Sequence, residues 1–170
     1  MRPSRGGSAS SPRYYTAADY HEMYKAGKVT PLQVAQTLLS TIKKGQSTPS
    51  KYEDAWLEFP GKEQMVLEAA KASTERYAAG KFLGILDGVP IGVKDDIDVK
   101  GYPNQVGMQR KPGIPCFEDK KETSWPVLKL QEAGAVVIGR NKMHECGSET
   151  SGLNVREEQP SVFSSESEHF

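Results

Sequence analysis

A short apolar run, residues 89–93, ends directly at a lysine, Lys94. Its β-branched residues and the glycines at 88 and 92 predict a strand that is buried on both faces, not the arm of a surface hairpin. Buried strands of this kind occur in α/β sheets, where ligand crevices open at the C-terminal ends of the strands. The sequence therefore places the Lys94 amine where chemistry is expected.

Two interpretations of Lys94 remain open on the residues alone. Burial disfavours a charged ammonium, so a lysine at a buried strand end can act as a base near neutral pH. The carboxylates of Asp95, Asp96 and Asp98 act in the opposite direction, because a facing carboxylate holds the proton on the amine. Lys94 is then either a catalytic base or an ordinary strand-end lysine paired with an aspartate, which is the more common arrangement.

Helices and strands alternate along the rest of the chain. Capping threonines, prolines in first turns and glycine stops predict four helices, over residues 17–26, 31–42, 62–79 and 124–133. A short strand is expected over residues 54–59 and a second buried strand over 135–138. This order is typical of an α/β fold.

Two long motifs resemble one known family. Residues 86–101 read Leu-Asp-Gly-Val-Pro-Ile-Gly-Val-Lys-Asp-Asp-Ile-Asp-Val-Lys-Gly. Residues 130–145 read Leu-Gln-Glu-Ala-Gly-Ala-Val-Val-Ile-Gly-Arg-Asn-Lys-Met-His-Glu, followed by Gly147 and by Ser-Gly-Leu-Asn at 151–154. In this order they are similar to the amidase signature family. Departures at Ile85, Asp87 and the pair 141–142 affect loop chemistry and leave the lysine in place.

The resemblance implies a reaction, a fold and a site. The family hydrolyses the carbon–nitrogen bond of carboxamides with two serines and a lysine, and Lys94 matches that lysine. The loop over residues 139–154 borders the family's substrate site, so Met143, Ser148 and Ser151 are candidate pocket residues. The implied fold class is α/β, a mixed β-sheet core flanked by helices and truncated before the later strands. No cofactor is implied, and the expected partner is a small-molecule amide.

The two serines of the family's triad are expected after Asn154, in loops rich in glycine and serine. The sequence reaches Phe170 without such a pattern, and Ser164 and Ser165 lack the glycines that a tight loop requires. We therefore expect a chain that carries only the lysine of the triad and is inactive alone. Two other classes remain open: a non-catalytic truncated fragment or interaction module, and a small α/β domain in which Lys94 binds an anion.

The ends of the chain differ in composition from the middle. Residues 1–13 are basic and lack large apolar side chains, residues 155–170 are acidic, and both are expected to be disordered around an amidase-like region at 14–154. A formal net charge of +0 gives no reason to expect a nucleic-acid partner. No apolar stretch is long enough for a membrane span. His144 and Cys146 lack a partner pair at zinc spacing, so no metal site is expected.

A cytoplasmic protein is the expectation from these features. The alternative is organellar import, because the start of the chain is rich in arginine and serine and free of acidic residues. The sequence sets no oligomeric state.

Overall fold

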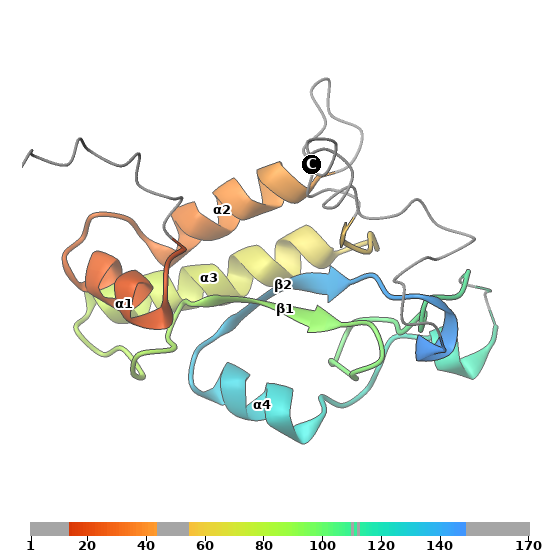
Figure 1. The fold of residues 1–170 in the computed structure, drawn as a ribbon. Helices are drawn as coiled ribbons and strands as arrows, with labels where there is room; N and C mark the ends of the chain where they lie inside the picture. The colour runs from red at the N-terminus through yellow and green to blue at the C-terminus, as the bar shows by residue number, and fades with distance from the viewer. Residues whose placement is uncertain (1–13, 44–54, 110, 112, 149–170) are drawn as a thin grey trace, which may run out of the picture.

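A computed structural model of the 170-residue chain describes residues 14–43, 55–109, 111 and 113–148. The expectations for the leader at 1–13, the tail at 155–170 and the pocket position Ser151 lie outside these residues. The fold consists of four α-helices, two strands and two short 3-10 turns within the described ranges (Figure 1). In chain order they are α1 (Ala17–Lys25), α2 (Pro31–Ile42), α3 (Lys62–Ala78), β1 (Pro90–Lys94), η2 (Pro115–Phe117), α4 (Trp125–Glu132), β2 (Val136–Asn141) and η3 (Glu145–Gly147).

Local chemistry sets the helix ends as predicted. Thr16 accepts a hydrogen bond from the Asp19 amide, and Thr30 accepts one from the Gln33 amide ahead of a proline at the first helical position. Three helices are followed by glycines with positive φ, a conformation that favours glycine. These glycines are Gly27, Gly80 and Gly134. The four predicted helices are confirmed.

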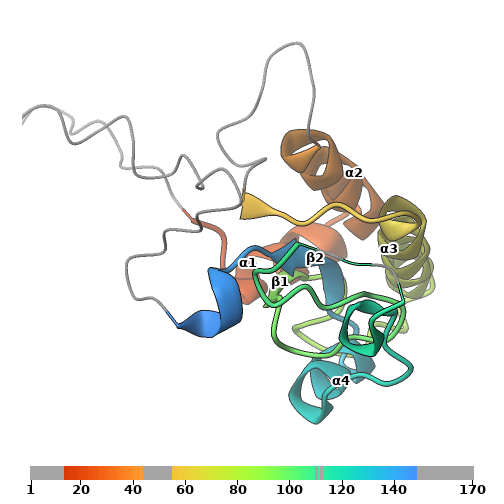
Figure 2. The same ribbon diagram turned by 90° about the vertical axis from the view of Figure 1, so that its right-hand side faces the viewer.

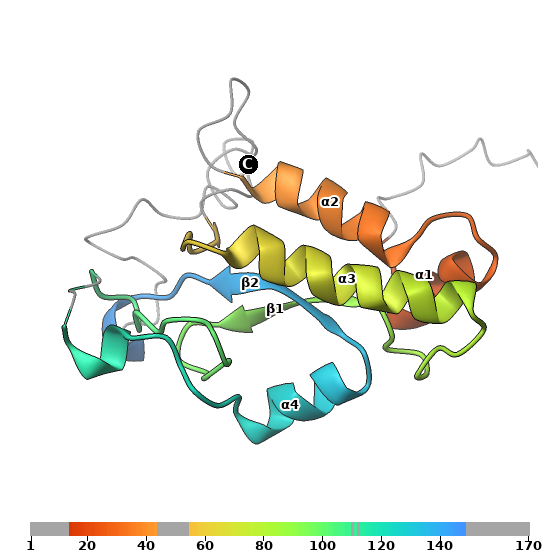
Figure 3. The same ribbon diagram turned by 180° about the vertical axis from the view of Figure 1, so that it is seen from behind.

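The sheet is built from a strand–helix–strand unit. β1 and β2 pair in parallel from Pro90↔Val136 to Lys94↔Asn141, with an irregularity between Ile91 and Gly92. α4 lies in the connection that crosses from one strand to the other (Figure 3). Seen end-on, α2 and α3 lie on one side of the strands and α4 on the other (Figure 2). The α/β class predicted from the sequence is confirmed.

The strand predicted over residues 54–59 is reduced to one antiparallel bridge in the described part of this segment. Trp56 pairs with Asn141, and the Leu57 amide donates to the Arg140 carbonyl at 2.9 Å. The pairing ends there because Gly61, in the left-handed conformation, turns the chain directly into α3. The Trp56 ring lies beside Gly92 and Gly139, where a Cβ atom would come within 3.1 Å of it at either position.

Burial on both faces holds for β2 and is wrong for β1. In β2, residues 136–140 are all buried, and alternate side chains enter different cores. Val136 and Ile138 pack with Ala35, Ile42, Val66 and Ala70 of the α2–α3 layer, whereas Val137 packs with Val93, Val99, Tyr102 and Val127. In β1, Gly92 and Lys94 are exposed and only Val93 is buried. Among the described residues, β2 is the only strand paired with β1.

A buried carboxylate joins the end of α3 to the start of β1. Asp87 accepts hydrogen bonds from the Ser73 hydroxyl at 2.7 Å, from Arg76 Nε at 2.9 Å and from the Leu83 amide at 2.9 Å. Burial raises the pKa of Asp87, but the hydrogen bonds from Arg76, Ser73 and the Leu83 amide outweigh it and bring the pKa below its ordinary value of 3.8. Asp87 therefore supports the fold in its charged form.

α1 is attached to this region through Tyr24, whose buried hydroxyl donates to the Gly88 carbonyl at 3.1 Å. Of the helices that the structure describes, none is both long and apolar enough to cross a membrane.

The lowered pKa of Asp87 predicts how stability changes with pH. A carboxylate whose pKa is lower in the folded state stabilises the fold above its unfolded pKa, and this contribution is lost as the pH falls through the folded pKa. Asp87→Asn should therefore lower the free energy of unfolding by about 2 kcal/mol at neutral pH. The deficit should shrink once the pH falls below the ordinary aspartate value of 3.8. Urea unfolding of both proteins across this range measures it. A deficit that stays constant with pH would contradict the assignment.

Two glycines that end helices form a matched pair for a packing test. Both have positive φ, but a Cβ atom at Gly134 would lie 2.6 Å from Asp87 Oδ1 and 2.9 Å from Asp87 Cα, whereas Gly80 has nothing within 4 Å. Gly80→Ala should cost only the conformational penalty of about 1–2 kcal/mol. Gly134→Ala should add an overpacking penalty of roughly 1–3 kcal/mol. Equal melting temperatures for the two variants would show that Asp87 does not confine Gly134.

Candidate active site

Lys94 occupies the last position of β1, at the end of the sheet where both parallel strands finish (Figure 1). Its side chain is 54% exposed, and the ammonium Nζ lies 3.0 Å from Asp96 Oδ2. The prediction that this lysine is buried is therefore wrong within the described part of the chain. The expectation of an aspartate partner is met by Asp96, whereas Asp95 and Asp98 make their contacts elsewhere.

Asp95 turns inward and is completely buried. Its carboxylate accepts hydrogen bonds from the Gln105 amide at 3.0 Å and the Gly107 amide at 3.2 Å. Burial raises the pKa of Asp95, against the opposing effect of these amides and of the Arg140 charge. Asp95 thus ties the end of β1 to the loop at 105–107.

Arg140 of β2 contacts the backbone of Lys94, which was not anticipated from the sequence. Its guanidinium donates from Nη1 to Asn104 Oδ1 at 2.8 Å and from Nη2 to the Lys94 carbonyl at 3.0 Å. The Asn104 amide in turn donates to Asp98. A usable signal was present, because Arg140 lies two residues after an apolar run, 135–138, that was itself predicted to be a buried strand. A charged residue in that place requires buried partners.

The loop at 105–107 packs against the turn that follows β2. The Cys146 amide donates to the Val106 carbonyl at 2.9 Å, and both residues have positive φ, 53° for Val106 and 52° for Cys146. A Cβ atom at Gly107 would lie 2.4 Å from the His144 carbonyl oxygen, so only glycine fits. A β-branched residue with positive φ is strained, and such strain concentrates at functional sites.

Two of the candidate pocket residues, Met143 and Ser148, flank this turn, and no described hydrogen bond joins either of them to Lys94. Met143 is half-buried, and its terminal methyl lies 3.5 Å from the position of a Cβ atom at Gly147. Ser148 is exposed, and its hydroxyl donates to the Glu145 carbonyl at 2.8 Å. Their role in binding substrate stays a prediction. Within the described ranges, no three His, Cys, Asp or Glu side chains gather as a metal site would require.

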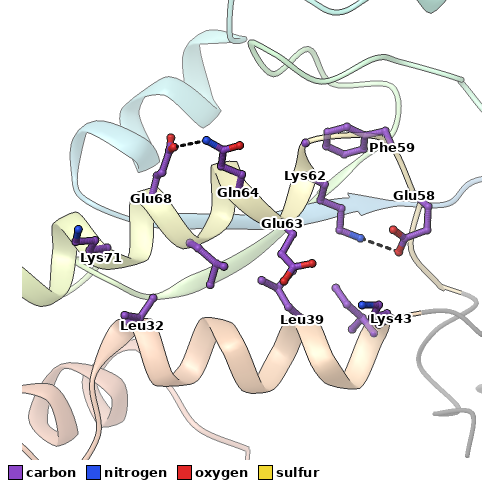
Figure 4. Close-up of a pocket in the computed structure, with 13 residues that line it drawn as sticks. Leu32, Leu39, Lys43, Glu58, Phe59, Lys62, Glu63, Gln64, Glu68 and Lys71 are labelled. Carbon is purple, nitrogen blue, oxygen red and sulfur yellow. Dashed lines mark hydrogen bonds and ion pairs between the residues drawn. The ribbon is translucent and has the colours of Figure 1, made fainter. Parts of the chain in front are cut away.

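A groove of about 660 Å³ opens elsewhere, between α2 and the first half of α3 (Figure 4). Leu39, Phe59 and Leu67 are among its apolar lining residues, and Lys94 is not part of it. At one end lies Lys62, which is 4% exposed and donates to Glu58 at 3.0 Å and to the Leu57 carbonyl at 3.3 Å. Lys62 therefore already has its partners, and Lys94 at the end of β1 does not line the groove.

Comparison with known proteins places the chain in a family. The amidase profile matches residues 15–158. A fatty acid amide hydrolase of Medicago truncatula is 36% identical over 148 residues, which cover 86% of this chain and 23% of the relative. A fatty acid amide hydrolase of Arabidopsis thaliana is 35% identical over 148 residues, covering 85% of this chain and 23% of the relative.

A solved amidase structure shares the fold with a TM-score of 0.63 and 28% sequence identity, over 81% of this chain and 29% of that one. The chain thus spans less than a third of the length of each relative and structure compared. The sequence profile covers the segment that bears Lys94 and the turn after β2. This chain belongs to the amidase family.

Proposed function

We propose that this chain supplies the base of an amide-hydrolysing site, and that Lys94 is that base. The observation that carries the proposal is the placement of Lys94 at the C-terminal end of the parallel pair, in a chain of the amidase family. Its amine is half-exposed and accessible, and the strained turns at 106 and 146 lie at the same end of the sheet. The substrate class is a small carboxamide.

The chemistry follows from the needs of acyl transfer. A neutral Lys94 amine takes the proton of a hydroxyl, the hydroxyl oxygen bonds to the carboxamide carbon, and the carbonyl π electrons move to oxygen. Collapse of this intermediate breaks the carbon–nitrogen bond, and the Lys94 ammonium returns its proton to the departing amine. Water then releases the acyl group from the hydroxyl oxygen by the same steps.

We further propose that the 170-residue chain does not hydrolyse amides on its own. Neither of the serine-bearing patterns expected of the family occurs in its sequence. A lysine base without its hydroxyl partner retains only small effects on rate, because triad members act as a unit.

The anion-binding alternative gains less support from the site. Asp96 lies 3.0 Å from the Lys94 ammonium, so a carboxylate ligand would have to displace an internal partner and face the remaining negative charge. A non-catalytic fragment that retains the family's surface stays the second candidate. It would be favoured if Lys94→Ala left the kcat of an active chimera unchanged.

A chimera tests the role of Lys94 directly. Residues 15–158, the range that the amidase profile matches, replace the corresponding region of the Medicago truncatula relative, and hydrolysis of a chromogenic carboxamide is measured. Lys94→Ala in the chimera should lower kcat by at least about 1,000-fold, because a triad has lost its base. The control is Lys81→Ala, which removes an exposed lysine after α3 and should leave kcat unchanged.

The 170-residue chain provides the second arm of this test. It should show no amide hydrolysis above that of buffer. Hydrolysis that is equal in the chain and in its Lys94→Ala variant would assign the activity to another group. A chimera that is active with or without the Lys94 amine would refute its role as the base.

A further inference from the structure

We propose that Arg140 is a positioning residue for Lys94. Its guanidinium holds the carbonyl oxygen at the end of β1 and thereby fixes the direction in which the Lys94 side chain leaves the sheet. The effect on catalysis rests on the proposed function of Lys94, whereas the effect on the position of its side chain does not.

The contacts of Arg140 converge on the backbone that carries the lysine. Nη2 donates to the Lys94 carbonyl at 3.0 Å, and the Ile97 amide donates to the same oxygen at 3.1 Å. The carbonyl is therefore held from two sides, by the neighbouring strand and by the turn that follows. Side-chain direction in a strand is set by the backbone, so a fixed peptide at this position fixes the base of the Lys94 side chain.

Arg140 also connects this peptide to the loop beside it. Nη1 donates to Asn104 Oδ1 at 2.8 Å, and Nη2 lies 3.6 Å from Asp95 Oδ1. Asp95 accepts from the amides of residues 105 and 107. Residues on both sides of the peptide between Lys94 and Asp95 are thus anchored to one loop.

Stability alone does not account for this arrangement. The Arg140 side chain is 1% exposed, and its Nε has no hydrogen-bond partner within the part of the chain that the structure describes. A buried donor left unpaired is costly, and a buried ion pair adds little or nothing to stability compared with apolar packing. The described hydrogen bonds are made by the two terminal nitrogens, and Nη2 holds the peptide that carries the lysine.

The test compares Arg140→Met with a matched control. Methionine keeps an unbranched apolar side chain and removes every donor. Arg76→Met makes the same change at another arginine that is paired with a buried aspartate, Asp87, and whose contacts do not include Lys94. Both variants are made in the 170-residue chain, and the lysines are labelled by reductive methylation with carbon-13. The Lys94 methyl resonance is assigned with Lys94→Arg.

In the unchanged chain, the Lys94 resonance should lie apart from those of unpaired exposed lysines, because the ammonium is held beside Asp96 at 3.0 Å. Arg140→Met should move this resonance to the chemical shift of unpaired exposed lysines. It should also raise the hydrogen-exchange rate of the Ile97 amide by about tenfold, because the carbonyl that this amide contacts loses its hydrogen bond from a charged donor. Arg76→Met should leave the Lys94 resonance in place. In the active chimera, Arg140→Met should lower kcat by about 100-fold with a smaller change in KM.

An unmoved Lys94 resonance in a cooperatively folded Arg140→Met protein would overturn the proposal and leave Arg140 a purely structural residue. If that variant does not fold, Arg140→Lys decides, because it keeps the charge but cannot donate to Asn104 and the Lys94 carbonyl in the fork geometry of arginine. A resonance unmoved by Arg140→Lys is equally fatal. Failure of the chimera to depend on Lys94 would reject the proposed function, while the resonance and exchange measurements would still decide the geometry.

Discussion

The parallel pairing of β1 with β2 is the interaction on which the rest of this structure depends. It aligns the two strand ends, so that the lysine at the end of β1 and the arginine in β2 lie beside one another. β2 supports this arrangement because both its faces are covered, one by α2 and α3 and the other by the cluster around Val99, Tyr102 and Val127. A strand buried in this way fixes its register, since a slip of one residue would exchange the contents of the two cores.

Two polar anchors hold the two ends of β1. At its start, Asp87 gathers donors from α3 and from the loop at residue 83, and at its finish Asp95 gathers the amides of 105 and 107. The electrostatic balance differs between them. The donors of Asp87 lower its pKa, whereas burial prevails at Asp95 and raises its pKa. The strand that carries the proposed base is thus fixed at both ends by carboxylates rather than by apolar packing alone.

Much of this was accessible from the sequence, and the reason is local chemistry. Thr16, Thr30 and the glycines after the helices are short-range signals, so the helices were predicted close to their observed bounds. The second strand was found through its apolar run, and the family through two motifs in order. The exposure of β1 was not predictable, because it depends on which segments cover the strand and not on its own composition. The sequence could have indicated that Arg140 is buried, but not which groups it contacts. Its partners, Asn104 and the Lys94 carbonyl, lie 36 and 46 residues away in the chain.

The glycines of the two strands are required for close packing, whereas those at the helix ends are favoured by a positive φ. Gly92 and Gly139 are register partners, and neither has a positive φ. Because neither residue has a side chain, the indole of Trp56 packs closely against both strands. Through that ring, the stretch leading into α3 is clamped to the sheet one residue before the Leu57 amide donates to the arginine carbonyl. A methyl group added at either glycine would lie 3.1 Å from this ring, so the indole would have to shift away from the strand that ends in the proposed base.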